Sequence, residues 1–514
     1  MRLNVIIGGK AGQGINKTSG IVADVLVKQG YFIFNYRDYQ SLIRGGHNFN
    51  TLCISDEPIL SHDSVGDVLI AMDDRTLKTH KSHMKKNAVI ITADNFIDEG
   101  RNLNIALAGA LMKILGFSVE ILTEEVRKVF PKNEKALESA KKGFDKVEAK
   151  YSFGKLNNKI MILSGSEAVA VGARASGLDV YIAYPMTPST NALHAMASNQ
   201  IKDKMMVFQA EGEIAVANMA LGASFAGAKT MVGTSGGGFD LMSEALSMQG
   251  MSEIPLTVYL ASRMGPGTGV PTYTSQADLG IALHAGHGEF SRAVVAPANP
   301  TEVSQKICEA LFLSEKFRSL SIVLSDKHLA ESEYSFLDSP LKFPQFKINR
   351  KVAGEGIVKA SSYESDKFGN STESYILTEK NVESRLKKYE KMSQYVRDNF
   401  EMIKFHGNKK SKNLIVTWGS TTNAVIDAVK GLDYKVLQVI YMKPMSNEIK
   451  KEIEKAENVV LIECNSIGQL GRLIREKTGF EIKNKLLKYN GRPFHCDELK
   501  KYLEEVLNGF KKRR

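Results

Sequence analysis

Cysteines and long apolar runs are scarce in this chain of 514 residues. It has four cysteines, and the two closest in sequence, Cys464 and Cys496, are 32 positions apart. The chain therefore lacks the short cysteine spacings that bind iron–sulfur clusters or zinc. No stretch approaches the ~20 apolar residues of a membrane span, and Met1–Lys10 does not have the pattern of a signal peptide. We expect a cytoplasmic protein without a membrane partner and without a metal site of its own.

The charge of the chain is basic but evenly spread. Lys and Arg number 68 against 57 Asp and Glu, a formal net charge of +11. Acidic and basic residues alternate along the chain except at the tail, Lys511–Arg514. A nucleic-acid-binding protein concentrates its basic residues on one face, so no nucleic-acid partner is expected. Anionic small molecules or an acidic protein suit this charge better.

The length predicts about three domains. Short β-branched runs alternate with amphipathic stretches, as in strand–helix–strand units with parallel sheets. The sequence therefore predicts the α/β class with several doubly wound domains. We place an α/β domain at 1–152, a second at 153–338, an extended connection at 339–411 and a third domain at 412–514. Within the connection, Val382–Tyr395 has the pattern of a charged helix.

A glycine-rich segment follows the first predicted strand, Asn4–Ile7. Gly8–Gly14 precedes a helical pattern over Ile15–Lys28, and the N-terminus of a helix after such a turn favours anions. The third glycine of a dinucleotide fingerprint is missing, and Lys17 comes too late for a Walker A loop. A tight turn that packs the helix on the strand is an equally good interpretation.

The candidate anion ligands in this first domain are Gly12, Gly14 and Arg44. Arg44 belongs to a second turn, Arg44–His47, which either binds an anion or only reverses the chain.

Unusual loops follow four predicted strands of the second domain. These strands are Val180–Tyr184, Met206–Gln209, Thr230–Gly233 and Leu256–Ala261. The carboxyl ends of parallel strands lie at one edge of a sheet, where ligands bind. We therefore expect the side chains of the four loops to meet.

The first two of these loops carry a hydroxyl and two carboxylates. Pro188 suits the first position of a helix, which makes Thr187 the predicted N-cap with its hydroxyl near the strand end. A plain cap is the alternative role. Glu211 and Glu213 precede a helix of small residues, Ile214–Ala228, which permits close packing. A buried carboxylate there has a raised pKa and can share a proton with a ligand nitrogen, whereas an exposed one only favours the helix dipole.

The other two loops carry glycines and an arginine. Thr234–Gly238 places three consecutive glycines before a predicted helix, Phe239–Met248, and lets the backbone approach a bound group. The last loop, Ser262–Thr272, holds Arg263, whose planar fork matches a carboxylate. A flexible turn and a surface arginine are the alternatives.

In this order the four loops resemble the alpha subunit of 2-oxoacid:ferredoxin oxidoreductases. The matching segments are Tyr184–Ser189 for YPITPS, with Met186 for isoleucine, Gln209–Glu211 for QxE, Thr234–Gly238 for TSGxG, and Arg263–Thr272 for RxGPSTGxPT, with Gly267 for serine.

The resemblance extends to both ends of the chain. Gly8–Gly14 is similar to the gamma domain that some members fuse before alpha, and Glu463–Leu470 is similar to the ExNxxGQL motif of a transketolase C-terminal-like domain. Tyr363–Asp366 departs from the EHDE segment of the fused branch, which leaves the substrate open among pyruvate, 2-oxoglutarate and other 2-oxoacids. The fused arrangement resembles 2-oxoglutarate enzymes more than pyruvate enzymes.

The resemblance implies a pyrimidine-binding domain for thiamine diphosphate at 153–338. Glu211 would hydrogen-bond the aminopyrimidine ring and activate the cofactor, and Thr187 and Arg263 would bind the 2-oxoacid. Further cofactor contacts are implied for Tyr184, Pro185, Thr234, Ser235 and Gly236. Gly12, Gly14 and Arg44 would be possible contacts to coenzyme A.

The resemblance also implies partners. The chain lacks the GDG…N signature of the magnesium diphosphate site and any cysteine cluster, and the family carries Mg²⁺ and a [4Fe–4S] cluster on a beta subunit. The expected reaction is oxidative decarboxylation of a 2-oxoacid, such as 2-oxoglutarate, to acyl-coenzyme A with electrons passed to ferredoxin. The alternative is a non-catalytic nucleotide-binding scaffold with a degenerate thiamine fold, against which the intact Thr187, Glu211 and Arg263 argue.

Overall fold

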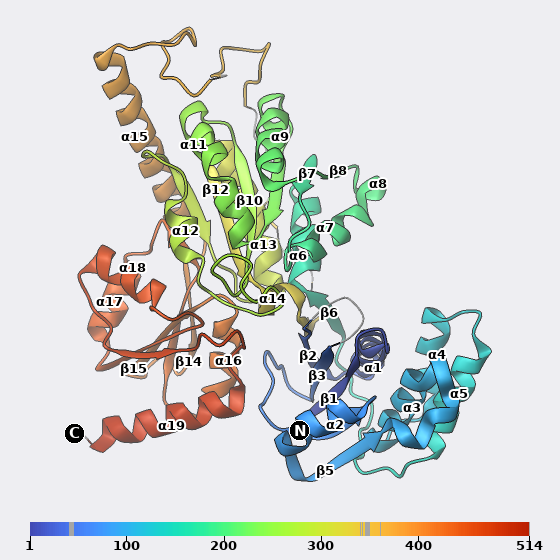
Figure 1. Cartoon of the computed structure of the whole chain (residues 1–514). Helices are drawn as coiled ribbons and strands as arrows, with labels where there is room; N and C mark the ends of the chain where they lie inside the picture. Colours follow the sequence, from blue (N-terminus) through green and yellow to red (C-terminus); the bar gives the residue numbers. More distant parts are fainter. Residues whose placement is uncertain (41–45, 340, 342, 345–349, 360, 513–514) are drawn as a thin grey trace. The chain divides into compact units, whose positions relative to one another are not determined.

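A computed structural model of the chain describes residues 1–40, 46–339, 341, 343–344, 350–359 and 361–512 (Figure 1). It divides into two compact units. Unit 1 comprises Met1–Leu163, Ser332–Pro340 and His495–Lys501. Unit 2 comprises Ser164–Glu331, Leu341–Phe494 and Tyr502–Arg514. Within the described ranges, no helix is both long enough and apolar enough to span a bilayer.

Unit 1 is built on a mixed sheet in the order β5-β4-β1-β3-β2-β13-β6. Its strands are β1 (Arg2–Lys10), β2 (Phe32–Asp38), β3 (His47–Ser55), β4 (Gly66–Ala71), β5 (Met84–Thr92), β6 (Ile160–Ser164) and β13 (Glu333–Leu337). β3 pairs antiparallel with both β1 and β2, whereas β4 runs parallel to β1. The connection from β2 to β3 is too short for a helical crossover, which accounts for the antiparallel pair in a domain expected to be parallel.

The helices of unit 1 bury the apolar face of this sheet. They are α1 (Ile15–Lys28), α2 (Asp74–His80), α3 (Leu103–Leu115), α4 (Val119–Val129), α5 (Glu134–Asp145) and the 3₁₀ turns η1 (Lys81–His83) and η2 (Ala93–Asn102). Helix α1 has the predicted bounds, and its residues Ile21, Val22, Val25 and Leu26 are all buried in the core. The predicted first strand is longer than expected, because β1 includes Gly8 and Gly9.

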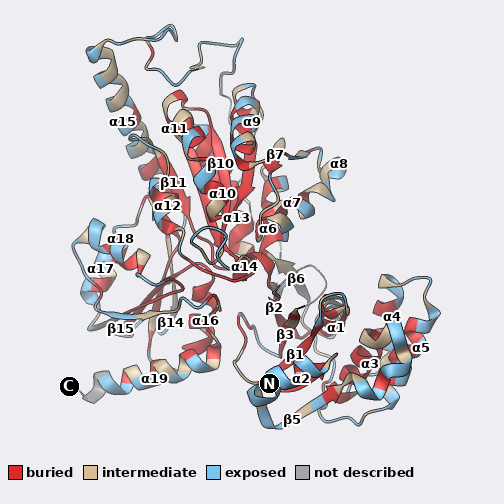
Figure 2. Ribbon diagram, viewed as in Figure 1, coloured by how far each residue is buried: buried red, intermediate tan, exposed pale blue. Residues whose placement is uncertain are grey.

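The main sheet of unit 2 has the order β17-β11-β12-β10-β9-β7-β8. Its strands are β7 (Val180–Ala183), β8 (Met206–Gln209), β9 (Thr230–Thr234), β10 (Leu256–Ser262), β11 (Arg292–Val295), β12 (Leu320–Asp326) and β17 (Tyr441–Lys443). All of them are parallel except β17, which pairs antiparallel with β11. β10 and β12 are buried along their whole length (Figure 2), as expected for central strands covered on both faces.

Helices surround this sheet. They are α6 (Gly165–Ala175), α7 (Thr190–Ala197), α8 (Gln200–Asp203), α9 (Glu213–Phe225), α10 (Gly236–Leu241), α11 (Ser243–Ser252), α12 (Leu279–His284), α13 (Pro300–Phe317) and α14 (Lys327–Glu331). The predicted helix Phe239–Met248 is divided into α10 and α11, and it begins at Gly236. The three glycines therefore form the first turn of a helix instead of a loop before it.

A second sheet of unit 2 has the order β14-β16-β15-β18-β19. Its strands are β14 (Ile403–Gly407), β15 (Asn413–Trp418), β16 (Lys435–Val439), β18 (Asn458–Glu463) and β19 (Asn484–Leu487). The helices of this region are α15 (Tyr375–Asn399), α16 (Thr421–Ala428), α17 (Glu448–Lys455), α18 (Gln469–Thr478) and α19 (Cys496–Lys512). The charged helix expected at Val382–Tyr395 is thus confirmed as part of the longer α15. The α/β class is confirmed, while the limits at 152, 338 and 411 stay predictions.

Candidate functional site

The loops that follow β7, β8, β9 and β10 meet at one edge of the parallel sheet. Ala183 at the end of β7 is in register with Gln209 of β8 and with Gly233 of β9. Thr234 of β9 is in register with Leu260 of β10. The strands therefore end at nearly the same level, and the side chains that follow them project into a common region.

Arg263 and Thr187 are in direct contact at this edge. A guanidinium NH of Arg263 donates a hydrogen bond to the backbone carbonyl of Thr187 at 2.9 Å. The prediction that Thr187 caps the next helix is wrong. The Thr187–Pro188 peptide is cis, and α7 begins at Thr190, whose N–H bonds to the carbonyl of Met186. The turn that ends in Pro188 places the Thr187 carbonyl toward the arginine and leaves helix initiation to later residues.

The glycines of Thr234–Gly238 allow close packing against two carboxylates. A β-carbon on Gly236 would lie 2.5 Å from an Asp278 carboxylate oxygen. One on Gly238 would lie 2.3 Å from the Thr234 hydroxyl and 2.7 Å from the Glu213 side chain. Any larger residue at these two positions would displace a neighbour.

Asp278 and Glu213 are carboxylates that face Arg263. Burial raises the pKa of Asp278 to about 6; Ser262 and Arg263 lower it, and Asp240 raises it. Burial also lowers the pKa of Arg263, an effect that the charges of Asp278 and Glu213 oppose. Sequence reasoning missed Asp278, because an aspartate before a short helix is typical of a cap, although its side chain makes no cap hydrogen bond to α12.

Glu211 and Glu213 have opposite environments. Glu213 is the first residue of α9 and is 6% exposed, whereas Glu211 is exposed in the turn between β8 and α9. Tyr184 is also exposed, and Pro185 is partly so. Of the two carboxylates in this loop, Glu213 is therefore the buried one, and Glu211 is exposed on the surface of this chain.

Five buried polar atoms at this edge have no hydrogen-bond partner among the described residues. They are Glu213 Oε1, Ser235 Oγ, Ser262 Oγ, Arg263 Nε and Asp278 Oδ2. Buried polar groups in proteins are nearly always paired, so a cluster of unpaired ones indicates a place for a polar ligand. Both donors and acceptors are present, which fits the mixed hydrogen-bonding edge of an aminopyrimidine and the carboxylate of a 2-oxoacid.

The glycine-rich loop of unit 1 is a compact turn. Gly12 and Gly14 have φ of 94° and 85°, and the Gln13 side chain accepts a hydrogen bond from the Lys10 N–H at 2.6 Å. The positive φ angles explain the glycines. Arg44, the third candidate here, lies outside the described residues.

The cysteines and the other side chains that could bind a metal ion are not grouped together in the described part of the chain. All four cysteines are buried, and none of them forms a disulfide bond. The described residues include no group of three or more His, Cys, Asp or Glu side chains that could hold a metal ion.

Two family models match the chain. Residues 171–398 match the thiamine diphosphate-binding model of pyruvate flavodoxin/ferredoxin oxidoreductases, and residues 4–101 match the pyruvate ferredoxin/flavodoxin oxidoreductase model. A 2-oxoglutarate synthase subunit KorA from Methanocaldococcus jannaschii is 31% identical over 61% of this chain and 90% of its own length. The chain belongs to the 2-oxoacid:ferredoxin oxidoreductase alpha-subunit family.

Other relatives extend this likeness over the whole chain. A 2-oxoacid:ferredoxin oxidoreductase subunit alpha from Sulfolobus sp. is 29% identical over 100% of this chain and 98% of its own. Among solved structures, the 2-oxoglutarate:ferredoxin oxidoreductase from Magnetococcus marinus, with 2-oxoglutarate, coenzyme A and succinyl-CoA bound, superimposes with a TM-score of 0.88 at 26% identity. That match covers 98% of this chain and 99% of the other, so the alpha-subunit fold is present from end to end.

Proposed function

We propose that this alpha subunit, together with a beta subunit, catalyses the thiamine diphosphate-dependent oxidative decarboxylation of a 2-oxoacid, with 2-oxoglutarate as the preferred substrate. The 2-oxoacid and coenzyme A yield acyl-coenzyme A, carbon dioxide, a proton and two electrons. The two electrons reduce ferredoxin. The main structural support is the cluster of Arg263, Thr187, Glu213 and Asp278, with its unpaired polar atoms, at the carboxyl edge of the parallel sheet. This cluster lies inside the region that matches the thiamine diphosphate-binding model.

The cofactor supplies the nucleophilic carbon that attacks the keto group and the electron sink for decarboxylation. Glu211 would hydrogen-bond the aminopyrimidine ring and hold a proton there. Tyr184, Pro185, Thr234, Ser235 and Gly236 would also contact the cofactor, and the buried Ser235 hydroxyl has no hydrogen-bond partner among the described residues. Because Glu211 is exposed in this chain, the beta subunit would cover it and exclude water from it.

Arg263 binds the carboxylate of the 2-oxoacid. One guanidinium NH is held by the Thr187 carbonyl, which orients the fork and leaves other N–H groups for the substrate. Thr187 itself hydrogen-bonds the 2-oxoacid. Asp278 adds a carboxylate to the charged surroundings of Arg263.

The remaining parts of the reaction belong to partners. The beta subunit would carry Mg²⁺, the diphosphate site and the [4Fe–4S] cluster, and ferredoxin would accept the electrons. Coenzyme A would contact Gly12, Gly14 and Arg44 of the gamma-type domain, and the complex would work in the cytoplasm. The ligands named for the Magnetococcus marinus structure support 2-oxoglutarate and coenzyme A as substrates.

The test is to purify the alpha subunit with its cysteine-rich beta partner and to measure reduction of a viologen dye with a panel of 2-oxoacids. We expect dye reduction to require coenzyme A and to be fastest with 2-oxoglutarate. A faster rate with pyruvate or a branched-chain 2-oxoacid would correct the substrate. A stable complex that reduces no dye with any 2-oxoacid would favour a non-catalytic scaffold.

A further inference from the structure

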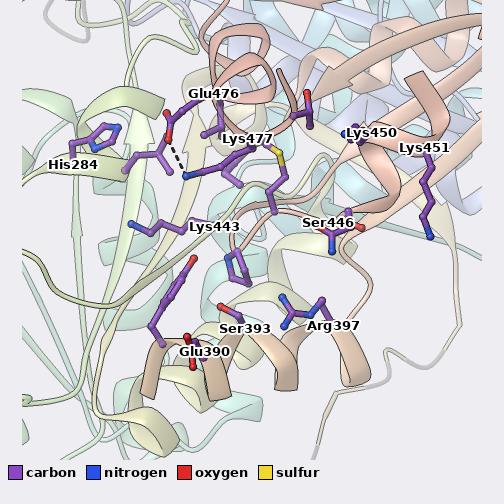
Figure 3. A pocket seen from close by; sticks show the side chains of 18 of the residues that line it. His284, Glu390, Ser393, Arg397, Lys443, Ser446, Lys450, Lys451, Glu476 and Lys477 are labelled. Carbon is purple, nitrogen blue, oxygen red and sulfur yellow. Dashed lines mark ion pairs between the residues drawn. The ribbon is translucent and has the colours of Figure 1, made fainter. Parts of the chain in front are cut away.

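A basic cavity of about 710 Å³ lies in unit 2, away from the residues discussed so far (Figure 3). Residues of α12, α15, α17 and α18, of β17 and of the segment after β17 line it. Five of the lining side chains are cationic and three are anionic, and His284 adds a titratable ring. The cationic ones are Arg397, Lys443, Lys450, Lys451 and Lys477. In Figure 3 the side chains of Lys443 and Lys477 extend toward the side on which His284 lies.

Two cations at this cavity are buried or half-buried without a carboxylate partner. Lys443 lines both this cavity and an adjoining one of about 370 Å³, to which Arg292 also contributes. Arg292 is 3% exposed; it donates to the carbonyl of Ala285 at 2.7 Å, and its Nε makes no hydrogen bond. Among the described residues, neither side chain takes part in an ion pair; Lys443 Nζ lies 5.7 Å from the centroid of the Tyr389 ring, and the Arg292 guanidinium lies 4.4 Å from that of Phe290.

Burial without a counter-charge is unfavourable for a cation. Burial, together with the positive charges of Arg292 and Lys477, lowers the pKa of Lys443 to about 8, while Glu476 opposes this shift. Burial alone lowers the pKa of Arg292 to about 10. Two of the three acidic lining residues are engaged with other lysines, since Glu476 pairs with Lys477 at 2.8 Å and Glu454 with Lys450 at 3.9 Å. The cavity thus has positive charge that the described residues do not neutralise.

The sheet register separates this cavity from the candidate site. Arg292, at the start of β11, is in register with Leu320, the first residue of β12. Arg263 follows Ser262, which is in register with Asp326, the last residue of β12. Six residue steps along a strand span about 20 Å. The cavity therefore lies at the amino edge of the parallel sheet, opposite the edge assigned to the 2-oxoacid.

We propose that this cavity is a second ligand site, which binds a small organic anion bearing phosphate groups. Several lysine ammonium groups, as compact point charges, suit the separate charges of a phosphorylated molecule better than a single carboxylate does. The apolar surface of Met442, Pro444 and the Tyr389 ring fits the organic body of such a ligand. The volume lies within the range of small-molecule sites, about 300–1,000 Å³.

Calorimetric titration of the alpha–beta complex tests this site with pyrophosphate, ATP and citrate as probes. We expect pyrophosphate and ATP to bind, with affinity that falls as salt is added. Lys443→Met should weaken both at least tenfold, while Lys410→Met, which removes an exposed lysine between β14 and β15, should not. No binding of either phosphate probe, tighter binding of citrate, or unchanged binding to Lys443→Met would overturn the proposal.

The stability of the same variant gives a second readout. Removing a half-buried cation that lacks a counter-charge should leave the melting temperature of the ligand-free complex unchanged or raise it. Pyrophosphate should raise the melting temperature of the wild-type complex and of Lys410→Met, but not of Lys443→Met. A lower melting temperature for ligand-free Lys443→Met would mean that Lys443 stabilises the fold by itself, and the proposal would fail. Because binding is measured directly, a negative result here is separate from any failure of the proposed activity.

Discussion

The guanidinium of Arg263 donates a hydrogen bond to the carbonyl oxygen of Thr187, 76 positions earlier in the chain and 2.9 Å away. The bond joins the loop after β10 to the loop after β7, with β9 between them in the sheet. Both residues were expected to bind the 2-oxoacid, and the bond holds the arginine in a fixed orientation beside the threonine. It uses the backbone of Thr187, so the threonine hydroxyl is not occupied by this contact.

Replacement of Arg263 should affect substrate binding more than catalysis at saturation. Arg263→Met removes a charge-assisted interaction of about 2–3 kcal/mol, so we expect KM for the 2-oxoacid to rise on the order of 100-fold. Arg263→Lys keeps the charge without the planar fork, so its KM should lie between that of the wild type and that of Arg263→Met. Initial rates over a range of 2-oxoacid concentrations measure the effect. Arg174→Met, at an exposed arginine of α6, is the matched control, and an unchanged KM for Arg263→Met would remove the residue from the substrate site.

Replacement of Glu211 should stop turnover without dissociating the alpha–beta complex. Glu211→Gln keeps the shape of an exposed side chain and removes its ability to hold the proton, so dye reduction should fall at least about 100-fold. Subunit association, measured by gel filtration, should be unchanged. Glu213→Gln is the comparison two residues away. If Glu213→Gln abolishes turnover while Glu211→Gln is active, the activating carboxylate is the buried one.

Two adjacent glycines of α10 should respond in opposite ways to alanine. At Gly238 the new methyl group would lie 2.3 Å from the Thr234 hydroxyl and displace Glu213, so Gly238→Ala should cost about 1–3 kcal/mol of unfolding free energy and weaken thiamine diphosphate binding. At Gly237 the nearest atom is 3.8 Å away, and Gly237→Ala should gain up to about 1 kcal/mol from helix propensity. Thermal unfolding and cofactor titration measure both. Equal effects of the two substitutions would contradict the packing described here.

Acid should destabilise unit 1 through a buried histidine pair. His47 and His80 share a 2.8 Å contact between their Nε2 atoms, and burial, together with the charges of His47 and His83, lowers the pKa of His80 from 6.5 to about 4. Because the folded pKa lies below the unfolded one, the unfolded chain binds a proton that the folded chain does not. Stability should therefore fall as pH drops from about 6.5 to 4, by up to about 3 kcal/mol.

His80→Gln tests this assignment, because glutamine can still hydrogen-bond His47 but does not titrate. Urea unfolding at intervals between pH 4 and 7 should show a flatter profile for the variant. If the unfolding free energy of the variant falls with pH as steeply as that of the wild type, groups other than His80 cause the acid sensitivity.

Local sequence patterns were sufficient to predict where most of the helices and strands lie and which loops form the candidate site. Strand Met206–Gln209 and helix Ile15–Lys28 were predicted with the bounds that the structure has, because apolar periodicity and flanking turn residues act over a few neighbours. The same locality explains why the loops of Thr187, Glu211 and Arg263 were recognised: each follows a clear strand, and parallel strands bring their carboxyl ends together.

Contacts between distant segments were decided by the tertiary structure alone. Nothing near Asp278 in the sequence indicates that it packs against Gly236 of α10 and interacts electrostatically with Arg263, since these partners lie 42 and 15 positions earlier in the chain. β17 joins a sheet whose other strands precede it by more than a hundred residues, and this pairing places Lys443 beside Arg292. Burial and charge around a side chain depend on every segment packed against it. The sequence therefore determined which chemical groups the strand ends present, and only the packing decided which of them are buried, paired or left without a partner.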